Sequence, residues 1–260
     1  IDAIKGKKNM NIFVLHPHEK VSLVQRKLMS TVKEKNVFNI AIEGNFDDCQ
    51  NLVKSMFADK EFSNSINMSG VNSINWARII AQAVYYFYTY FQTQDKKPIN
   101  FSVPTGNFGD VYAGYLSKKM GLPINKLIVA TNKNDIIHRA ISNGKYEAES
   151  VIETNSPSMD IQIASNFERL IYDFYCDRDA KICNDFYANF PLDSINLPNN
   201  MWEKSTELFL SYSVNDLQTI KAIQEVYESH NYLIDPHTAV ASVAVDNLSK
   251  QLKNSTLILS

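Results

Sequence analysis

The chain has 260 residues, of which 45% are hydrophobic and 21% charged, and its formal net charge is -2. This composition is typical of an ordinary globular protein, and the length is sufficient for a sizeable core. The small net charge gives no electrostatic reason to expect binding to nucleic acid or to an anionic membrane, and no apolar run reaches the roughly 18 residues that a membrane-spanning helix needs.

Short β-branched and aromatic runs alternate with longer helical patterns along the chain. The expected strands are residues 11–15, 38–42, 100–103, 126–130 and 256–259. The expected helices are residues 22–31, 47–58, 74–91, 110–119, 135–142, 165–175, 215–229 and 238–252. Several strands are continuous apolar runs, which suits strands buried on both faces. The sequence therefore predicts an open, mostly parallel α/β sheet flanked by helices.

Polar residues mark several expected helix starts. Ser73, Asp110 and Asp135 each precede a helical pattern and are predicted to cap it. Residues 121–123, Gly-Leu-Pro, predict a helix end. Residues at about 147–200 are predicted to form an irregular insertion with two or three helices. Aromatic runs such as residues 85–88 are expected in core and interface packing.

The cysteines are Cys49, Cys176 and Cys183, and no two of them form a C-x-x-C pair. Reduced thiols in a cytoplasmic protein are the simplest interpretation, with a Cys176–Cys183 disulfide as the alternative. The chain begins with Ile1 and ends on an apolar run, so we expect both ends to be cut from a longer protein.

The most informative segment runs from Phe101 to Val111, with the sequence FSVPTGNFGDV. A buried strand enters a turn with two glycines, and a helix follows at once. Glycines let backbone N–H groups approach an anion, and a helix N-terminus carries about half a positive charge. We expect a phosphate cradle here, with Thr105 and Asn107 as side-chain donors. The alternative is a simple strand–helix turn capped by Asp110, since the segment matches neither G-x-G-x-x-G nor a Walker loop.

Two histidine-containing segments have residues that could carry chemistry. His16 and His18 flank a proline, but no cysteine or carboxylate cluster supplies further metal ligands, so no metal site is predicted. His237 could be catalytic, although a place in a helix-start turn explains it better.

Short sequence motifs spread along the chain resemble those of the threonine synthase family of bacteria and fungi, and they occur in the same order as in that family. The phosphate-loop motif SVPTGNFGD at residues 102–110 carries the resemblance most strongly. The other motifs lie at residues 16–22, 41–48, 72–78, 130–135, 156–161, 165–169 and 235–240.

This resemblance implies the fold type II of pyridoxal 5'-phosphate (PLP) enzymes, with residues 1–70 in a smaller α/β lobe and 71–260 in a larger, PLP-binding lobe. It implies that the PLP phosphate is held by Gly106, Asn107, Phe108, Gly109 and Asp110. The reaction would convert O-phospho-L-homoserine and water to L-threonine and phosphate, with PLP as electron sink.

By the same resemblance, Ser73, Asn75 and Arg78 are candidate substrate-binding residues near the active-site cleft. Asn75 and Arg78 are three residues apart and would share a helix face, and an arginine can bind a carboxylate or phosphate at two points. The alternatives are that Ser73 only caps the helix and that Arg78 pairs with a surface carboxylate.

The chain departs from the family because nothing in it matches the Schiff-base lysine segment. We therefore expect no catalytic residue in this chain and no threonine synthase activity from it alone. The alternatives are a non-catalytic remnant of that enzyme and another fold type II lyase. The sequence predicts no oligomeric state.

Overall fold

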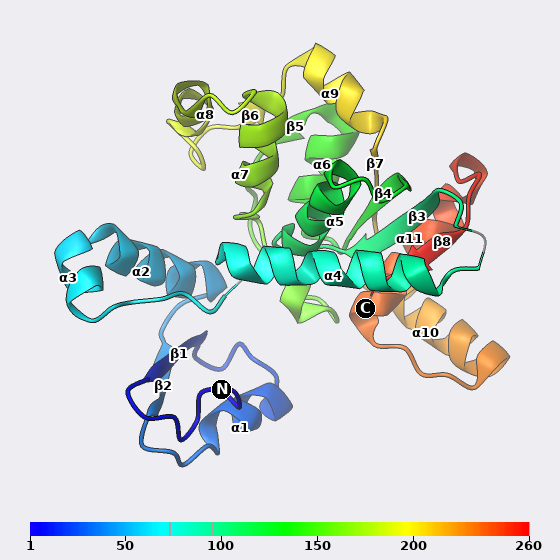
Figure 1. Cartoon of the computed structure of the whole chain (residues 1–260). Helices are drawn as coiled ribbons and strands as arrows, with labels where there is room; N and C mark the ends of the chain where they lie inside the picture. Colours follow the sequence, from blue (N-terminus) through cyan, green and yellow to red (C-terminus); the bar gives the residue numbers. More distant parts are fainter. Residues whose placement is uncertain (73, 95, 260) are drawn as a thin grey trace. The chain divides into compact units, whose positions relative to one another are not determined.

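The computed structural model describes residues 1–72, 74–94 and 96–259 (Figure 1). The chain divides into two compact units, Ile1–Ser69 and Gly70–Ser260. No helix among the described residues combines the length and the apolar character needed to cross a membrane.

The first unit is built on two parallel strands. The strands are β1 (Ile12–Pro17) and β2 (Val37–Ile42), and the helices are α1 (Leu23–Ser30), α2 (Phe46–Ala58) and α3 (Lys60–Ser65). Asn45 and Asp48 form a reciprocal capping box at the start of α2, which fixes where that helix begins. None of the residues of α1 is buried.

The second unit contains a four-stranded parallel sheet in the order β7-β4-β3-β8. The strands are β3 (Ile99–Pro104), β4 (Ile124–Thr131), β7 (Phe209–Ser213) and β8 (Thr256–Ile258). Both hydrophobic clusters found among the described residues belong to this unit. The second unit thus holds the core of the chain.

Alternate residues of β4 face opposite layers. Leu127 and Val129 pack with α4 (Trp76–Gln92), α5 (Gly109–Lys119) and α6 (Ile136–Asn143) on one face. Ile128 and Ala130 pack with α10 (Asp216–His230) and α11 (Pro236–Leu248) on the other. Figure 1 shows α4 and α5 against the sheet on the side away from α10 and α11. A strand buried on both faces explains the continuous apolar run in its sequence.

The segment between α6 and β7 is largely irregular. Its elements are β5 (Lys145–Tyr146), the 3-10 turn η1 (Pro157–Met159), α7 (Phe167–Leu170), the π-helical turn η2 (Ile171–Tyr175), α8 (Ala180–Tyr187), β6 (Ile195–Asn196) and α9 (Asn199–Thr206). A further 3-10 turn, η3 (Ser249–Gln251), follows α11. β5 and β6 pair antiparallel, so residues near the two ends of this segment lie side by side.

The predicted fold class is confirmed, and each expected strand is present with small shifts in its bounds. The edge strand β7 was missed, although residues 208–210 are apolar. The helix expected at residues 74–91 begins at Trp76, because Asn75 is its cap. The helix expected at residues 238–252 begins at Pro236, where the Asp235 carboxylate caps the first turn.

Candidate anion-binding site

The predicted phosphate loop joins β3, a central strand of the sheet, to α5. Thr105 begins the loop and is buried. Its N–H donates to the carbonyl of Ala130 at 2.7 Å, and its hydroxyl donates to the carbonyl of Val103 at 2.7 Å. The hydroxyl hydrogen thus fixes the end of the strand, so the structure does not support the predicted role of Thr105 as a side-chain donor to an anion.

The side-chain oxygen of Asn107 ties the loop to a distant segment. Its Oδ1 accepts hydrogen bonds from the backbone N–H of Ser165 at 2.7 Å and from the Ser165 hydroxyl at 2.6 Å. The N–H of Asn166 also donates to the backbone carbonyl of Asn107, at 3.2 Å. These contacts hold the loop against the start of α7, which sequence reasoning did not foresee.

Phe108 turns the chain into α5 through a left-handed backbone conformation, with φ of 61°. Such a conformation at a residue other than glycine is strained and needs support from its surroundings. The support is the buried ring, which packs edge-on against Phe167 at 5.1 Å and lies 6.2 Å from Phe209. Packing of the Phe108 side chain therefore sets the direction in which α5 begins.

Both loop glycines lie close to neighbouring segments. A Cβ on Gly106 would lie 2.9 Å from the carbonyl oxygen of Ser158. A Cβ on Gly109 would lie 3.2 Å from Ile79 and 3.3 Å from Asn166. A side chain at Gly106 would collide with the backbone of Ser158, whereas one at Gly109 would need the ends of the Ile79 and Asn166 side chains to move by a few tenths of an ångström.

The front of the loop opens on a cavity of about 170 Å³. Its lining comprises Gln82 and residues 104–111. Among the described residues, no protein acceptor pairs with the backbone N–H groups of Gly106, Phe108, Gly109 and Asp110. The first N–H groups of a helix have no intrahelical partner, and together they favour a bound anion. The loop therefore has the geometry and the donors to hold an anionic group such as phosphate.

Asp110 does not cap α5. The helix begins at Gly109, its cap position is Phe108, and no side chain of the described residues accepts a hydrogen bond there. The Oδ1 of Asp110 is buried and has no hydrogen-bond partner within the described part of the chain. Burial raises the pKa of this carboxyl to about 6, against a smaller lowering by the hydroxyl of Tyr86. A carboxyl that is readily protonated opposes a nearby anion less than a permanent carboxylate does.

The candidate substrate residues lie at the start of α4. Asn75 caps the helix, with its Oδ1 accepting from the N–H of Ala77 at 2.9 Å and its Nδ2 donating to the carbonyl of Gly70. Asn75 stands at the cap position of α4 and Arg78 in its first turn, where the N–H of Arg78 donates to the carbonyl of Asn75 at 3.0 Å. The Arg78 side chain is exposed. Ser73 lies outside the described residues, so its predicted capping and substrate roles have no structural counterpart here.

Residues that sequence reasoning did not select also shape the site. Gln82 on α4 lines the cavity, and Arg169 on α7 donates to the carbonyl of Ile74 at 2.7 Å and lies over the ring of Trp76 at 5.5 Å. Tertiary packing brings Gln82 to the cavity and Arg169 to the start of α4. The sequence indicated Arg169 only as part of the family motif at residues 165–169, to which no role is assigned.

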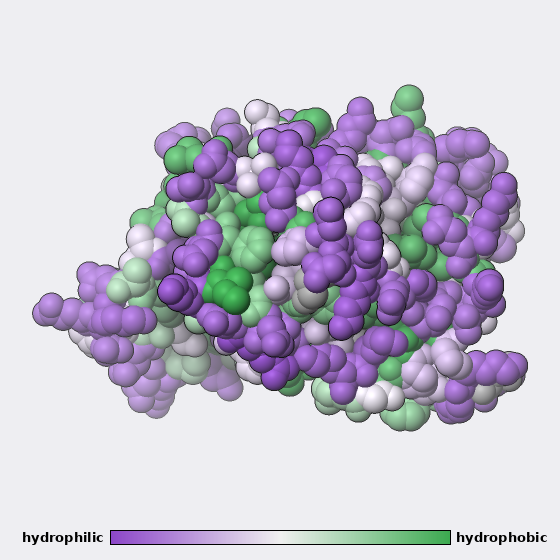
Figure 2. All heavy atoms as spheres, turned by 90° about the horizontal axis from the view of Figure 1, so that it is seen from above, coloured by the Kyte–Doolittle hydropathy of each residue, from purple (hydrophilic) through white to green (hydrophobic). Residues whose placement is uncertain are grey.

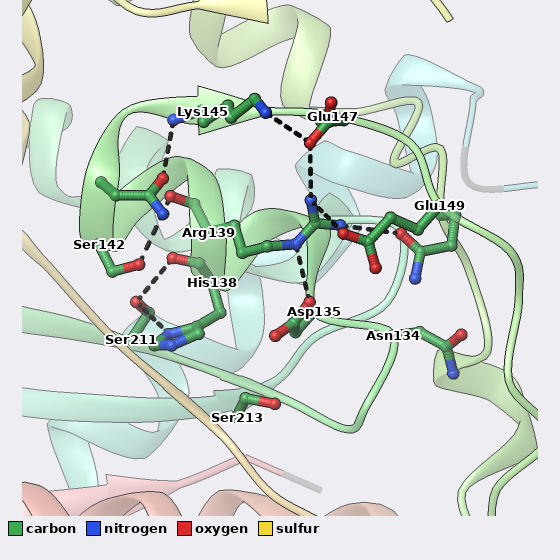
Figure 3. Close-up of polar contacts among 12 residues, drawn as sticks. Asn134, Asp135, His138, Arg139, Ser142, Lys145, Glu147, Glu149, Ser211 and Ser213 are labelled. Carbon is green, nitrogen blue, oxygen red and sulfur yellow. Dashed lines mark hydrogen bonds and ion pairs between the residues drawn. The ribbon is translucent and has the colours of Figure 1, made fainter. Parts of the chain in front are cut away.

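A second polar cluster lies on α6 and the chain after it (Figure 3). Arg139 pairs with Asp135 at 2.9 Å and with Glu149 at 3.0 Å. The expected cap at the start of α6 is therefore absent, because the Asp135 carboxylate pairs with Arg139 instead. The Nδ1 of His138 lies 2.9 Å from the hydroxyl of Ser211, and burial lowers the pKa of His138. The cluster fastens neighbouring segments to one another.

Two further histidines, His18 and His237, have local partners. His18 pairs with Glu43 at 2.7 Å, and the Nδ1 of His237 lies 2.9 Å from the carboxylate of Asp235 at the start of α11. Among the described residues, no group of three or more histidine, cysteine, aspartate or glutamate side chains could hold a metal ion.

Sequence comparison finds close relatives of this chain, although no family model matches it. The threonine synthase of Pseudomonas aeruginosa is 46% identical over 254 residues, which is 97% of this chain and 54% of that protein. The threonine synthase of Saccharomyces cerevisiae is 42% identical over 265 residues, which is 95% of this chain and 52% of that protein. The chain thus spans about half the length of the relatives it matches.

Solved structures give the same relationship. A PLP-bound threonine synthase from Brucella melitensis matches with a TM-score of 0.87 and 41% identity, covering 100% of this chain and 56% of that one. The yeast threonine synthase structure matches with a TM-score of 0.86 and 41% identity. Maize serine racemase, at 14% identity and a TM-score of 0.59, shares the fold alone.

Proposed function

Since this chain belongs to the threonine synthase family and spans about half the length of its relatives, we propose that it supplies the phosphate-binding part of a PLP site for threonine synthesis. The whole enzyme would convert O-phospho-L-homoserine and water to L-threonine and phosphate. The proposal rests on one observation above all. The cavity at the start of α5 is lined by backbone N–H groups that have no acceptor among the described residues.

The residues of this loop fit the phosphate group of PLP. The N–H groups of Gly106, Phe108, Gly109 and Asp110 would bind the phosphate oxygens, and the helix N-terminus would stabilise their charge. Asn107 would position the loop through Ser165. When bound, PLP supplies an electron sink for the carbanion chemistry of the reaction. The contribution of this chain is binding and orientation.

The catalytic lysine is proposed to come from outside this chain. None of the described residues that line the cavity is a lysine. We therefore expect that the 260 residues alone do not release phosphate from O-phospho-L-homoserine. Among the candidate substrate residues, Arg78 is the strongest, because it is exposed and forms no ion pair with a carboxylate among the described residues. Asn75 and Ser73 remain candidates from the family resemblance.

The remaining proposals concern the lobes and the compartment. The first unit would belong to the smaller lobe of the enzyme and the second unit to its PLP-binding lobe. All three cysteines are buried free thiols, which suits a reducing compartment, and we propose the cytoplasm.

The proposal is tested by comparing ligands that differ only in the phosphate. PLP and pyridoxal are titrated into the 260-residue chain by calorimetry. PLP is expected to bind at least about 10-fold more tightly than pyridoxal, and inorganic phosphate should compete with it. Equal affinities for the two ligands would refute the proposed role of the loop.

A pair of glycine variants separates binding from stability. Gly106→Ala places a methyl group against Ser158 at the loop, whereas Gly121→Ala, beyond the C-terminal end of α5, meets no neighbouring atom but strains a backbone φ of 103°. Both should lower stability, but only Gly106→Ala should weaken PLP binding, by about 10-fold. A similar loss in both variants would mean that general destabilisation, and not the loop, controls binding.

A further inference from the structure

The helix α4 carries an exposed apolar side. Ile80, Val84, Tyr88 and Phe91 recur at helical spacing and are 44%, 61%, 67% and 61% exposed. Ala77 and Ala81 lie on the same side and are also exposed. We call these six residues the outer face of α4. On the face shown in Figure 2, hydrophilic side chains predominate and hydrophobic ones form separate groups.

The opposite side of α4 is fixed in the core. Ile79, Ala83, Tyr86 and Tyr90 are buried there. The ring of Tyr86 packs edge-on against Phe101 of β3, with centroids 4.8 Å apart. The helix cannot rotate to bury its outer face without exposing these residues. The outer face therefore needs a partner from elsewhere.

The composition of α4 also indicates a helix that is covered on all sides. Its 17 residues, WARIIAQAVYYFYTYFQ, include a single charged residue, Arg78. A helix that is apolar around its whole circumference is typical of a buried position in a large protein. Exposed contiguous apolar surface on a folded protein commonly marks an interaction site.

The relatives indicate what that partner is. The Brucella melitensis threonine synthase covers the whole of this chain, but the match takes up only 56% of its own length. Just under half of that related protein therefore lies outside the match and folds in the same molecule as the matched part. A segment of the same protein acts at a high effective concentration and competes well against separate partners.

We propose that the outer face of α4 is the docking surface for the part of the threonine synthase fold that lies outside the match to this chain. The docking segment would present apolar side chains to Ile80, Val84, Tyr88 and Phe91. This inference rests on family membership and on packing, and it does not depend on PLP binding.

A cysteine-labelling experiment tests the proposal. Tyr88→Cys is made in the 260-residue chain and in a chimera in which this chain replaces the matching segment of Pseudomonas aeruginosa threonine synthase. Cysteine labelling at position 88 should be at least about 10-fold slower in the chimera, because the docking segment excludes the reagent. Leu217→Cys on α10, where the native side chain is 80% exposed, is the control and should react equally in both proteins. The native cysteines of this chain are buried and give a low background, and each chimera is compared with the same chimera lacking the introduced cysteine.

Three results would overturn the proposal. Equal labelling at position 88 in both proteins would show that the docking segment does not cover α4. Slow labelling in the 260-residue chain that speeds up on dilution would identify a second copy as the partner. Slow labelling in that chain at every concentration would mean that the face is covered within the chain itself.

A stability measurement on the chimera provides a second test. Val84→Lys should lower the melting temperature by about 5 °C or more, because a buried lysine would lack a partner. Leu217→Lys should change it by less than about 1 °C. Equal shifts for the two variants would contradict the proposal. Both experiments are performed without PLP, so their outcome is independent of the proposed function.

Discussion

The hydroxyl of Tyr86 donates a hydrogen bond of 2.8 Å to the backbone carbonyl of Asp110, and so joins α4 to the first turn of α5. Tyr86 of α4 is fully buried, and its ring lies against Gly114 of α5. The loop that precedes α5 is thus held from behind by α4. The position of the helix N-terminus is set by this contact as well as by β3.

Removing the Tyr86 hydroxyl tests this contact. Tyr86→Phe should lower the free energy of unfolding by about 1–2 kcal/mol, because a buried carbonyl loses its side-chain donor while the ring packing is kept. Denaturant unfolding measures the change. The exposed Tyr232→Phe serves as the control and should leave stability unchanged. An unaltered midpoint for Tyr86→Phe would show that the hydroxyl contributes nothing to stability.

Asp110 should make the stability of the chain depend on pH. Burial raises its pKa in the folded chain to about 6, from an ordinary value of 3.8. Ionisation therefore opposes folding. The contribution of the protonated group is complete below about pH 4 and is lost as pH rises through about 6, with a total of about 3 kcal/mol.

The variant Asp110→Asn should remove this dependence and be more stable than the native chain at pH 8. Unfolding is followed between pH 4 and pH 8 for the native chain, for Asp110→Asn and for Asp193→Asn, whose native side chain is exposed. The control should follow the native profile. A native profile that matches that of Asp110→Asn would contradict the assignment.

The same carboxyl should influence PLP affinity. Above its pKa, Asp110 carries a negative charge beside the proposed phosphate position, which disfavours a dianionic ligand. Asp110→Asn is therefore expected to bind PLP more tightly than the native chain at pH 8, with a smaller difference at pH 5. Calorimetric titrations at the two pH values measure this. An equal gain at both would point to a role other than charge.

The strained backbone of Phe108 predicts an unusual order of variant stabilities. Both Phe108→Ala and Phe108→Gly lose the ring contacts with Phe167 and Phe209, at a cost of about 3–5 kcal/mol. Glycine accepts a φ of 61° without strain, so Phe108→Gly should be about 1 kcal/mol more stable than Phe108→Ala. At an ordinary position alanine is the more stabilising residue. If Phe108→Ala proved more stable than Phe108→Gly, the left-handed conformation at position 108 would be absent.

The two units should differ in hydrogen exchange. Both hydrophobic clusters found among the described residues belong to the second unit, and α1 in the first unit has no buried residue. Local opening should therefore be easier in the first unit. Amides of β1 and β2 are expected to exchange at least about 10-fold faster than those of β3 and β4. Comparable protection in both pairs would mean that the first unit has a stable core of its own.

The sequence predicted the buried strands and long helices well because their signals are local. A continuous apolar run at residues 126–130 and an amphipathic pattern at residues 215–229 depend on neighbours along the chain. The positions of helix starts were less predictable. Asn75 and Phe108 occupy the cap positions that the sequence predicts for Ser73 and Asp110. At Phe108 the cause is tertiary, because the buried ring packs against Phe167 and Phe209.

The candidate site shows the same division. The turn with two glycines before a helix was visible in the sequence, and the cavity lies at that turn. The contact between Asn107 and Ser165 joins residues 58 positions apart, and no local sequence pattern predicts it. Gln82 reaches the cavity from another helix for the same reason. Contacts of this kind follow from the packing of the whole unit.

The most direct test of the proposed phosphate site is an NMR titration of the ¹⁵N-labelled 260-residue chain with PLP. The proposal predicts that the largest amide shifts fall on Gly106, Phe108, Gly109 and Asp110, and that pyridoxal, which lacks the phosphate, leaves these amides nearly unchanged. Binding of PLP that shifts other amides and leaves these four in place would contradict it.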